Sequence, residues 1–146
     1  MSSSAPPEPD PRDNDHLRVL ALGHFVGAGF ATLMLLFCLF HYSTFGSTIE
    51  RLPSPRREEF AAFFDSMTAF YLLMGGVCAI YAVANGASGW FLEQRRHRTF
   101  SLVVAAANFV HFPLGMALGV ATIVVLLRPT VRDAYAWSKQ VGQGVA

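Results

Sequence analysis

The stretch that decides the fold is "NGASGWFLEQRRHRTFSLVVAAAN", Asn85–Asn108, in which a charged segment separates two apolar flanks. The charges run from Glu93 to Arg98, and the midpoint between the two asparagines falls inside that segment, between Arg96 and His97. If two helices fold back on each other at the charges, residues equally far from the turn lie at the same depth, because a helix has a constant rise. The stretch therefore predicts a helical hairpin with its tip at the arginines.

The composition indicates a membrane protein. Of 146 residues, 53% are hydrophobic and 14% are charged, whereas an average soluble domain has about 25% charged residues. The length predicts one domain, and a net charge of +1 offers no basic field for nucleic acid. Arginine far outnumbers lysine, which favours a GC-rich bacterial genome. We expect an all-α, multi-pass protein of the cell inner membrane, with the lipid bilayer as its first partner.

The first apolar block, Val19–Phe40, has 22 residues without a formal charge, enough to span a hydrocarbon core of roughly 30 Å. It predicts a transmembrane helix over about 17–42. Residues 1–16 are rich in Pro, Ser and Asp, which predicts a disordered tail. This tail lacks the basic segment of a signal peptide, so we expect the helix to be retained.

The second helical pattern starts at Ser54-Pro55, a good N-cap and first-turn pair, and continues to about Phe91. At 1.5 Å per residue it would be roughly 55 Å long, which exceeds a bilayer. In residues 55–66 the aromatic side chains recur at helical spacing on one face, and charged side chains lie off that face. We therefore expect an amphipathic lead-in over 55–66 and a transmembrane span over 67–91.

The third block, Thr99–Leu127, has 29 residues without a charge and is interrupted by Pro113. Two full crossings would leave only about 14 residues each, and roughly 21 Å is too short to span a bilayer. The favoured interpretation is one kinked helix over 99–127, which makes three crossings. The alternatives are a re-entrant pair of half-helices or a fourth crossing, with the block split at Pro113. Residues 129–146 are predicted to form a polar tail with one short surface helix.

The distribution of Lys and Arg residues indicates how the chain is oriented across the membrane. With three crossings the two sides carry five and six Lys or Arg residues; with four they carry eight and three, which favours termini in the cytoplasm. The concentrated tip charges Arg95, Arg96 and Arg98 favour a cytoplasmic tip. Binding of anionic lipid headgroups is a second role that we expect for these three residues.

Small residues recur at helical spacing and predict close packing, because in lipid close backbone approach holds helices together. They are Gly23 and Gly27 in the first helix, Gly75, Ala79, Ala82, Gly86 and Gly89 in the second, and Gly115 and Gly119 in the third. Packing within one chain is the simplest interpretation. A homo-oligomer or a larger membrane complex is the alternative.

Four polar residues lie inside the apolar blocks: His24, Asn85, Asn108 and His111. Depth estimates predict a cluster of the first three, with His111 about one turn deeper. The cluster is interpreted as a hydrogen-bond network that holds three helices in register. Alternatively, His24 and His111 would be axial ligands of a b-type haem, or would bind a quinone headgroup. No cofactor is the main expectation, and no metal site is predicted, because Cys38 and Cys78 are isolated thiols.

Motifs of soluble enzymes, such as a phosphate-binding glycine loop, HExxH or a nucleophile elbow, are absent from the sequence. We therefore expect a non-enzymatic scaffold or accessory subunit. The alternatives are a redox anchor with haem or quinone, and a small oligomeric transporter or channel lined by the polar cluster.

Three segments carry a resemblance: "DHLRVLALGHF" (15–25), "SGWFLEQRRHRTF" (88–100) and "PLGMALGVATIVVLLRPTVR" (113–132). Together they resemble a family of uncharacterised small bacterial multi-pass membrane proteins over about residues 15–132. Met116 departs from that pattern, in which threonine usually follows the glycine of the Pro-x-Gly element. The resemblance implies a membrane location and no known activity or catalytic residue. The number of helices is similar to that of the membrane anchors of succinate dehydrogenase, whose histidine motif is missing here.

Overall fold

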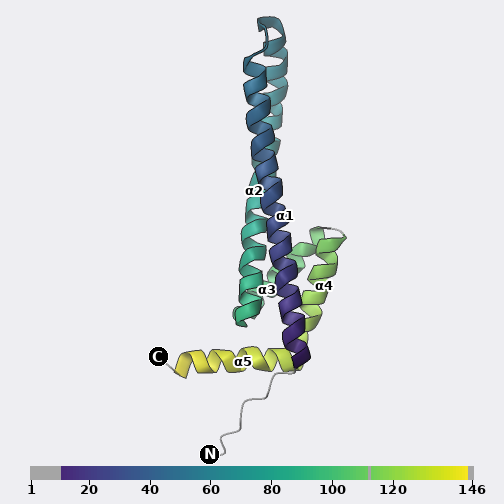
Figure 1. Cartoon of the computed structure of the whole chain (residues 1–146), viewed down its shortest axis with the longest axis vertical. Coiled ribbons are helices and arrows are strands. Elements are labelled where there is room, and N and C mark those ends of the chain that lie inside the picture. Colours follow the sequence, from purple (N-terminus) through teal and green to yellow (C-terminus); the bar gives the residue numbers. More distant parts are fainter. Residues whose placement is uncertain (1–10, 112, 145–146) are drawn as a thin grey trace, which may run out of the picture. The chain divides into compact units, whose positions relative to one another are not determined.

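The computed structural model describes residues 11–111 and 113–144, the last seven of them by backbone alone, and this part is helical with short turns and no strand. The elements are α1 (Pro11–Glu50), α2 (Ser54–Gln94), α3 (Arg98–Ala107), the 3₁₀ helix η1 (Asn108–Val110), α4 (Leu114–Leu127) and α5 (Pro129–Gly144) (Figure 1). The all-α fold class is confirmed.

Helices α1 and α2, of 40 and 41 residues, are each long and apolar enough to cross a membrane. A third span would exist only if α4 and the first half of α5, bent by 70° at their junction, formed one broken crossing. Both long helices exceed the expected spans 17–42 and 67–91, because the lead-in 55–66 continues into the span and α1 runs on to Glu50. At about 1.5 Å per residue each is near 60 Å long, about twice the hydrocarbon thickness.

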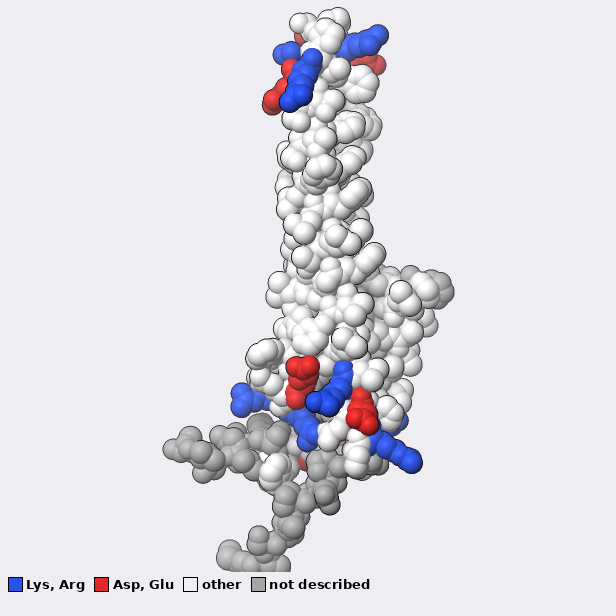
Figure 2. Space-filling model, viewed as in Figure 1, with Lys and Arg blue, Asp and Glu red and all other residues white. Residues whose placement is uncertain are grey.

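The chain divides into two compact units, through both of which α1 and α2 pass. One unit comprises residues 28–83, a helical hairpin closed by a turn at 51–53. Within this unit the charged side chains gather at the α1–α2 turn, and the remainder of its visible face carries none (Figure 2). The other unit contains the described residues up to Gly27 and from Ala84 onward, and it holds the core and the candidate site.

The core of this second unit joins four helices at their charged ends. Buried side chains from α1, α2, α4 and α5 meet there: Leu17, Leu20, Ala21, Leu92, Val125, Leu126, Val131 and Tyr135. The segment 129–146, expected as a polar tail with a short helix, thus supplies Val131 (1% exposed) and Tyr135 (8% exposed) to the core. Its helix is longer than expected and reaches Gly144.

The disorder predicted for residues 1–16 is wrong for the described residues 11–16, which form the first turns of α1; residues 1–10 lie outside the described part. The physical reason is a partner remote in sequence. Asp13, 7% exposed, accepts hydrogen bonds from Arg128 and Thr130. Composition carries no information on a contact across more than a hundred residues.

The tip of the hairpin between α2 and α3 lies where the sequence predicts it. The turn occupies residues 95–97, and both Arg95 (φ 51°) and His97 (φ 49°) adopt the left-handed conformation. Such backbone is uncommon for residues other than glycine, and here it reverses the chain within a very short segment. The rings of Phe91 and Phe100 then pack edge to face, with centroids 5.4 Å apart.

The expectation of one kinked helix over 99–127 is wrong. The chain reverses after Val110, and α4 packs back along α3, so that the two are the arms of a short hairpin (Figure 1). Pro113 has no N–H to continue a helix, and two glycines allow close approach. A Cβ on Gly119 would lie 2.4 Å from the Ala105 carbonyl oxygen, and one on Gly115 would lie 2.6 Å from that of Asn108. This block therefore forms two half-helices, α3 with η1 and α4.

We predict that Gly119→Ala destabilises the protein by about 1–3 kcal/mol, because the new methyl group meets a backbone oxygen that cannot move alone. Thermal unfolding of the purified protein in detergent measures the change. Gly29→Ala is the matched control, since a Cβ there meets nothing within 4 Å. Equal melting temperatures for the two variants would show that α3 and α4 are not in close contact.

Candidate functional site

The candidate site is a group of four polar side chains, one from each of α1, α2, η1 and α4, which we call the polar node. They are His24, Asn85, Asn108 and Thr122, all with 0% exposure. Polar groups at such positions in a membrane helix are costly unless they are hydrogen-bonded to one another. Their complete burial therefore requires that they pair.

The pairing centres on one atom. Asn85 Oδ1 lies 2.9 Å from His24 Nδ1 and accepts a hydrogen bond from Asn108 Nδ2 at 3.0 Å. The other ring nitrogen of His24, Nε2, lies 3.3 Å from Thr122 Oγ1. The four segments are thus joined by three side-chain hydrogen bonds, none of which lies within a single helix.

The carboxamide oxygen of Asn85 determines which ring nitrogen of His24 carries the proton. A carboxamide oxygen only accepts hydrogen bonds, so His24 Nδ1 must carry a proton. In the neutral ring Nε2 is then the acceptor, and it takes the hydroxyl proton of Thr122. Both ring nitrogens of His24 are therefore committed within the node.

The structure brings together three of the four polar residues singled out in the sequence. His24, Asn85 and Asn108 meet as the equal-depth argument predicts. His111 follows η1 and is exposed in the reversal between η1 and α4. Thr122 was not predicted as a member of the polar cluster, although it lies three residues after Gly119 on the small-residue face.

Glycines let the helices approach each other around the node. A Cβ on Gly27 would lie 3.8 Å from Asn85 Oδ1, and one on Gly89 would lie 3.1 Å from the Ala21 carbonyl oxygen. At Gly23 the nearest atom is a methyl group of Leu118, at 2.7 Å. Gly75 is buried within the 28–83 unit, beside Leu35. The remaining members of the predicted faces, Ala79, Ala82 and Gly86, are half-buried.

Three buried oxygen atoms, one each from α2, α3 and η1, have no hydrogen-bond partner within the described part of the chain. They are Ser88 Oγ, Ser101 Oγ and Asn108 Oδ1. Within the node, Asn108 Oδ1 thus has spare accepting capacity.

The three tip arginines have different environments. Arg95 donates to Asn14 Oδ1, and Arg98 Nε donates to the Leu126 carbonyl oxygen at 2.9 Å. The second contact satisfies a carbonyl in the last turn of α4, where a cation is favourable. Arg96 is exposed. Two of the three residues expected to serve orientation or lipid headgroups therefore also connect helices.

In the 28–83 unit a histidine and a tyrosine form a further polar contact. From the sequence, this region was interpreted only as the ends of spans. Tyr71 Oη and His41 Nδ1 are 2.6 Å apart. The imidazole of His41 also stacks against Phe37 and Phe45, with centroid distances of 5.9 and 5.6 Å. The contact of His41 with Tyr71, which also brings their ring centroids to 5.6 Å, links α1 and α2 inside that unit.

Among the described residues, no group of three or more His, Cys, Asp or Glu side chains could hold a metal ion. Cys38 and Cys78 are free thiols. No protein-family model, no curated protein and no solved structure matches the chain.

Within the polar node we predict that Asn85→Ala lowers the free energy of unfolding most, by about 1–3 kcal/mol, because it removes the acceptor of two hydrogen bonds. Asn108→Ala should cost less, since it removes one. Ser88→Ala is the buried control, and its hydroxyl has no partner within the described residues. Unfolding monitored by circular dichroism in detergent ranks the three variants by their free energy of unfolding. If Ser88→Ala lost as much stability as Asn85→Ala, the predicted role of the Asn85 hydrogen bonds would be refuted.

The charged end contains an ion pair outside the apolar segments, Arg128 Nη1 to Asp13 Oδ1 at 3.0 Å. The hydrogen bond from Thr130, with the guanidinium of Arg128, holds the pKa of Asp13 below its ordinary value of 3.8. A carboxyl group whose pKa is lowered by folding stabilises the protein above its unfolded pKa, and that contribution is lost as pH falls through the folded pKa.

We predict that stability falls on acidification below about pH 4, and that Asp13→Asn removes this part of the pH dependence. Melting temperatures between pH 7 and pH 3 measure it for both proteins. Asp133→Asn is the control, because Asp133 pairs with Arg132 only at 3.8 Å and both side chains are exposed. An identical pH profile for Asp13→Asn and the unmodified protein would mean that the ion pair contributes nothing.

Proposed function

We propose that this protein is a non-enzymatic scaffold or accessory subunit of a membrane. The observation that carries the proposal is the closed polar node, in which His24 uses both ring nitrogens and Asn85 uses its oxygen twice. Groups that bind substrate or move protons must be able to reach them. The four node residues are fully buried and bonded to one another, an arrangement that fixes helices in register.

A topology of two crossings plus a hairpin is consistent with this role. The arms of the hairpin, α3 with η1 and α4, have 13 and 14 residues, roughly 20 Å each, which is too short to cross a bilayer. We propose that the hairpin enters and leaves on the same side. That side then carries eight of the eleven Lys and Arg residues, so the positive-inside rule places both termini and the tip in the cytoplasm of an inner-membrane, multi-pass protein.

The exposed apolar surface supports a role in assembly. In the most apolar 18-residue stretch of α2, no side chain is buried within the described part of the chain. Along α2, Leu72, Leu73, Ile80 and Val83 are all about 70% exposed. In a bilayer such a face contacts lipid or a neighbouring helix. The small residues Gly76 and Ala79 on the same helix would permit close approach of a second copy or of another membrane subunit.

The redox alternative fits the geometry less well. A b-type haem needs a histidine nitrogen that is free to bind iron, but both nitrogens of His24 are hydrogen-bonded. His111 lies in the exposed reversal and does not join the node. These residues therefore do not fit a haem. A transporter or channel would need a path that the closed node of one chain does not provide, so a pore would have to lie between copies.

The resemblance to small bacterial multi-pass membrane proteins agrees with this proposal and adds no activity to it. The three quoted segments contain His24, the hairpin tip and Thr122. They would thus mark the elements that fold the cytoplasmic half of such a protein. This family membership is a proposal that rests on those short motifs.

Native mass spectrometry of the protein released from its own membrane in polymer-bounded lipid discs tests the scaffold role. We expect masses above one chain of 16.0 kDa, corresponding to a second copy or another protein subunit. An absorbance spectrum of the same sample, before and after dithionite, tests the alternative. A strictly single chain that shows a Soret band would replace the scaffold by a redox protein.

A further inference from the structure

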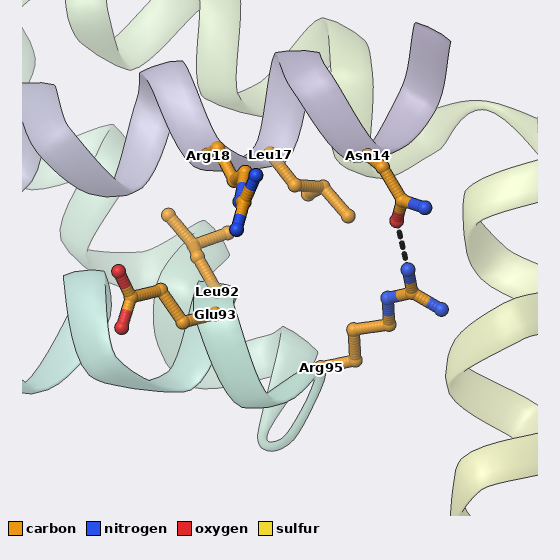
Figure 3. A pocket seen from close by; sticks show the side chains of 6 residues that line it. All are labelled: Asn14, Leu17, Arg18, Leu92, Glu93 and Arg95. Carbon is orange, nitrogen blue, oxygen red and sulfur yellow. Dashed lines mark hydrogen bonds between the residues drawn. The ribbon is translucent and has the colours of Figure 1, made fainter. Parts of the chain in front are cut away.

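Near the hairpin tip the surface of the second unit forms an open cavity of about 260 Å³ that the polar node does not use (Figure 3). It is lined by Asn14, Leu17 and Arg18 of α1 and by Leu92, Glu93 and Arg95 at the end of α2. Pockets for drug-sized molecules hold roughly 300–1,000 Å³, so this cavity suits a small polar group.

The lining combines an apolar pair with three charged groups. Leu17 and Leu92 are 5% and 0% exposed. Figure 3 shows Arg95 directed toward Asn14, to whose Oδ1 it donates, with Arg18 and Glu93 apart from that pair. Neither Arg18 nor Glu93 forms an ion pair or a side-chain hydrogen bond with another described residue. Their charges are therefore available to a ligand.

The charges define the chemistry of that ligand. Two guanidinium groups favour a phosphate, to which arginine donates parallel hydrogen bonds. Glu93 would repel a ligand that is only anionic, but it would pair with an ammonium group beside the phosphate. We propose that this cavity binds a phosphoethanolamine group, with the phosphate between Arg18 and Arg95 and the primary ammonium on Glu93.

The position of the cavity favours a bilayer lipid as the source of that group. Arg18 directly precedes the charge-free segment 19–49, and Glu93 directly follows the charge-free segment 66–92. The α1 face that continues from Arg18 is apolar and open: Val19, Leu22 and Val26 are 67%, 63% and 65% exposed. A phospholipid with its headgroup in the cavity would lay its acyl chains along this face. The inference requires the membrane location but not the scaffold role.

The test uses the full chain in nanodiscs that contain equal parts of phosphatidylethanolamine, phosphatidylcholine and phosphatidylglycerol, with retained lipids counted by native mass spectrometry. We expect phosphatidylethanolamine to be retained about tenfold over the other two, the effect of one charge-assisted hydrogen bond. The trimethylated ammonium of phosphatidylcholine cannot donate to Glu93, and phosphatidylglycerol has no ammonium.

Variants distinguish lipid binding in the cavity from attraction by the general charge of this surface. Arg18→Gln should abolish the enrichment, whereas the matched control Arg96→Gln, an exposed arginine at the same tip outside the lining, should leave it intact. Glu93→Gln should remove the preference over phosphatidylglycerol. Melting temperatures confirm that these exposed substitutions leave the fold intact.

Soluble phosphoethanolamine, added as a competitor, distinguishes the two sources. Displacement of the retained lipid would show that the cavity takes the headgroup from solution as well. Retention without displacement would identify the membrane lipid as the ligand. Equal retention of all three lipids, or equal effects of Arg18→Gln and Arg96→Gln, would overturn the proposal.

Discussion

One oxygen atom, Asn85 Oδ1, accepts hydrogen bonds from two different helical segments, and the arrangement of the second unit depends on it. In a hydrocarbon environment an unpaired amide costs several kcal/mol, so Asn85 has no acceptable state without its partners. The hydrophobic effect does little to hold helices together in lipid. A shared acceptor supplies what that effect cannot, because it fixes both the rotation and the register of α1, α2 and η1.

The hairpin of α3 and α4 depends on the node in turn. Its arms are short, and their contact relies on Gly115 and Gly119, which add no hydrophobic surface of their own. Asn108 lies in one arm and Thr122 in the other, and each bonds to a residue of a long helix. Backbone approach and side-chain pairing are therefore coupled. The glycines bring α4 close enough for Thr122 to reach His24, and that bond keeps α4 against the long helices.

The sequence predicted those parts of the structure that follow from local spacing. The symmetric asparagines predicted the α2–α3 turn, and helical rise predicted their meeting with His24. The reversal between η1 and α4 was not predictable in this way, because a Pro-x-Gly element suits a kinked helix as well as a turn. What decides between them is non-local: the fit of Gly119 against Ala105 and the bond from Thr122 to His24. The order of residues 11–16 likewise depends on Arg128, 115 positions from Asp13.

The charged end shows how the same residues serve topology and packing. Arginines on one side of a membrane set the orientation of the chain, but a guanidinium that is bonded to a carbonyl group or a carboxylate has fewer N–H donors left for a ligand. Arg98 is bonded to Leu126 and Arg128 to Asp13, so these two hold α4 and α5 in place. The charges left for recognition are consequently few, and Arg18 and Glu93 lie together beside a cavity. Since they have opposite signs, selectivity at this end requires a ligand with two charges, whereas any anion would suit arginines alone.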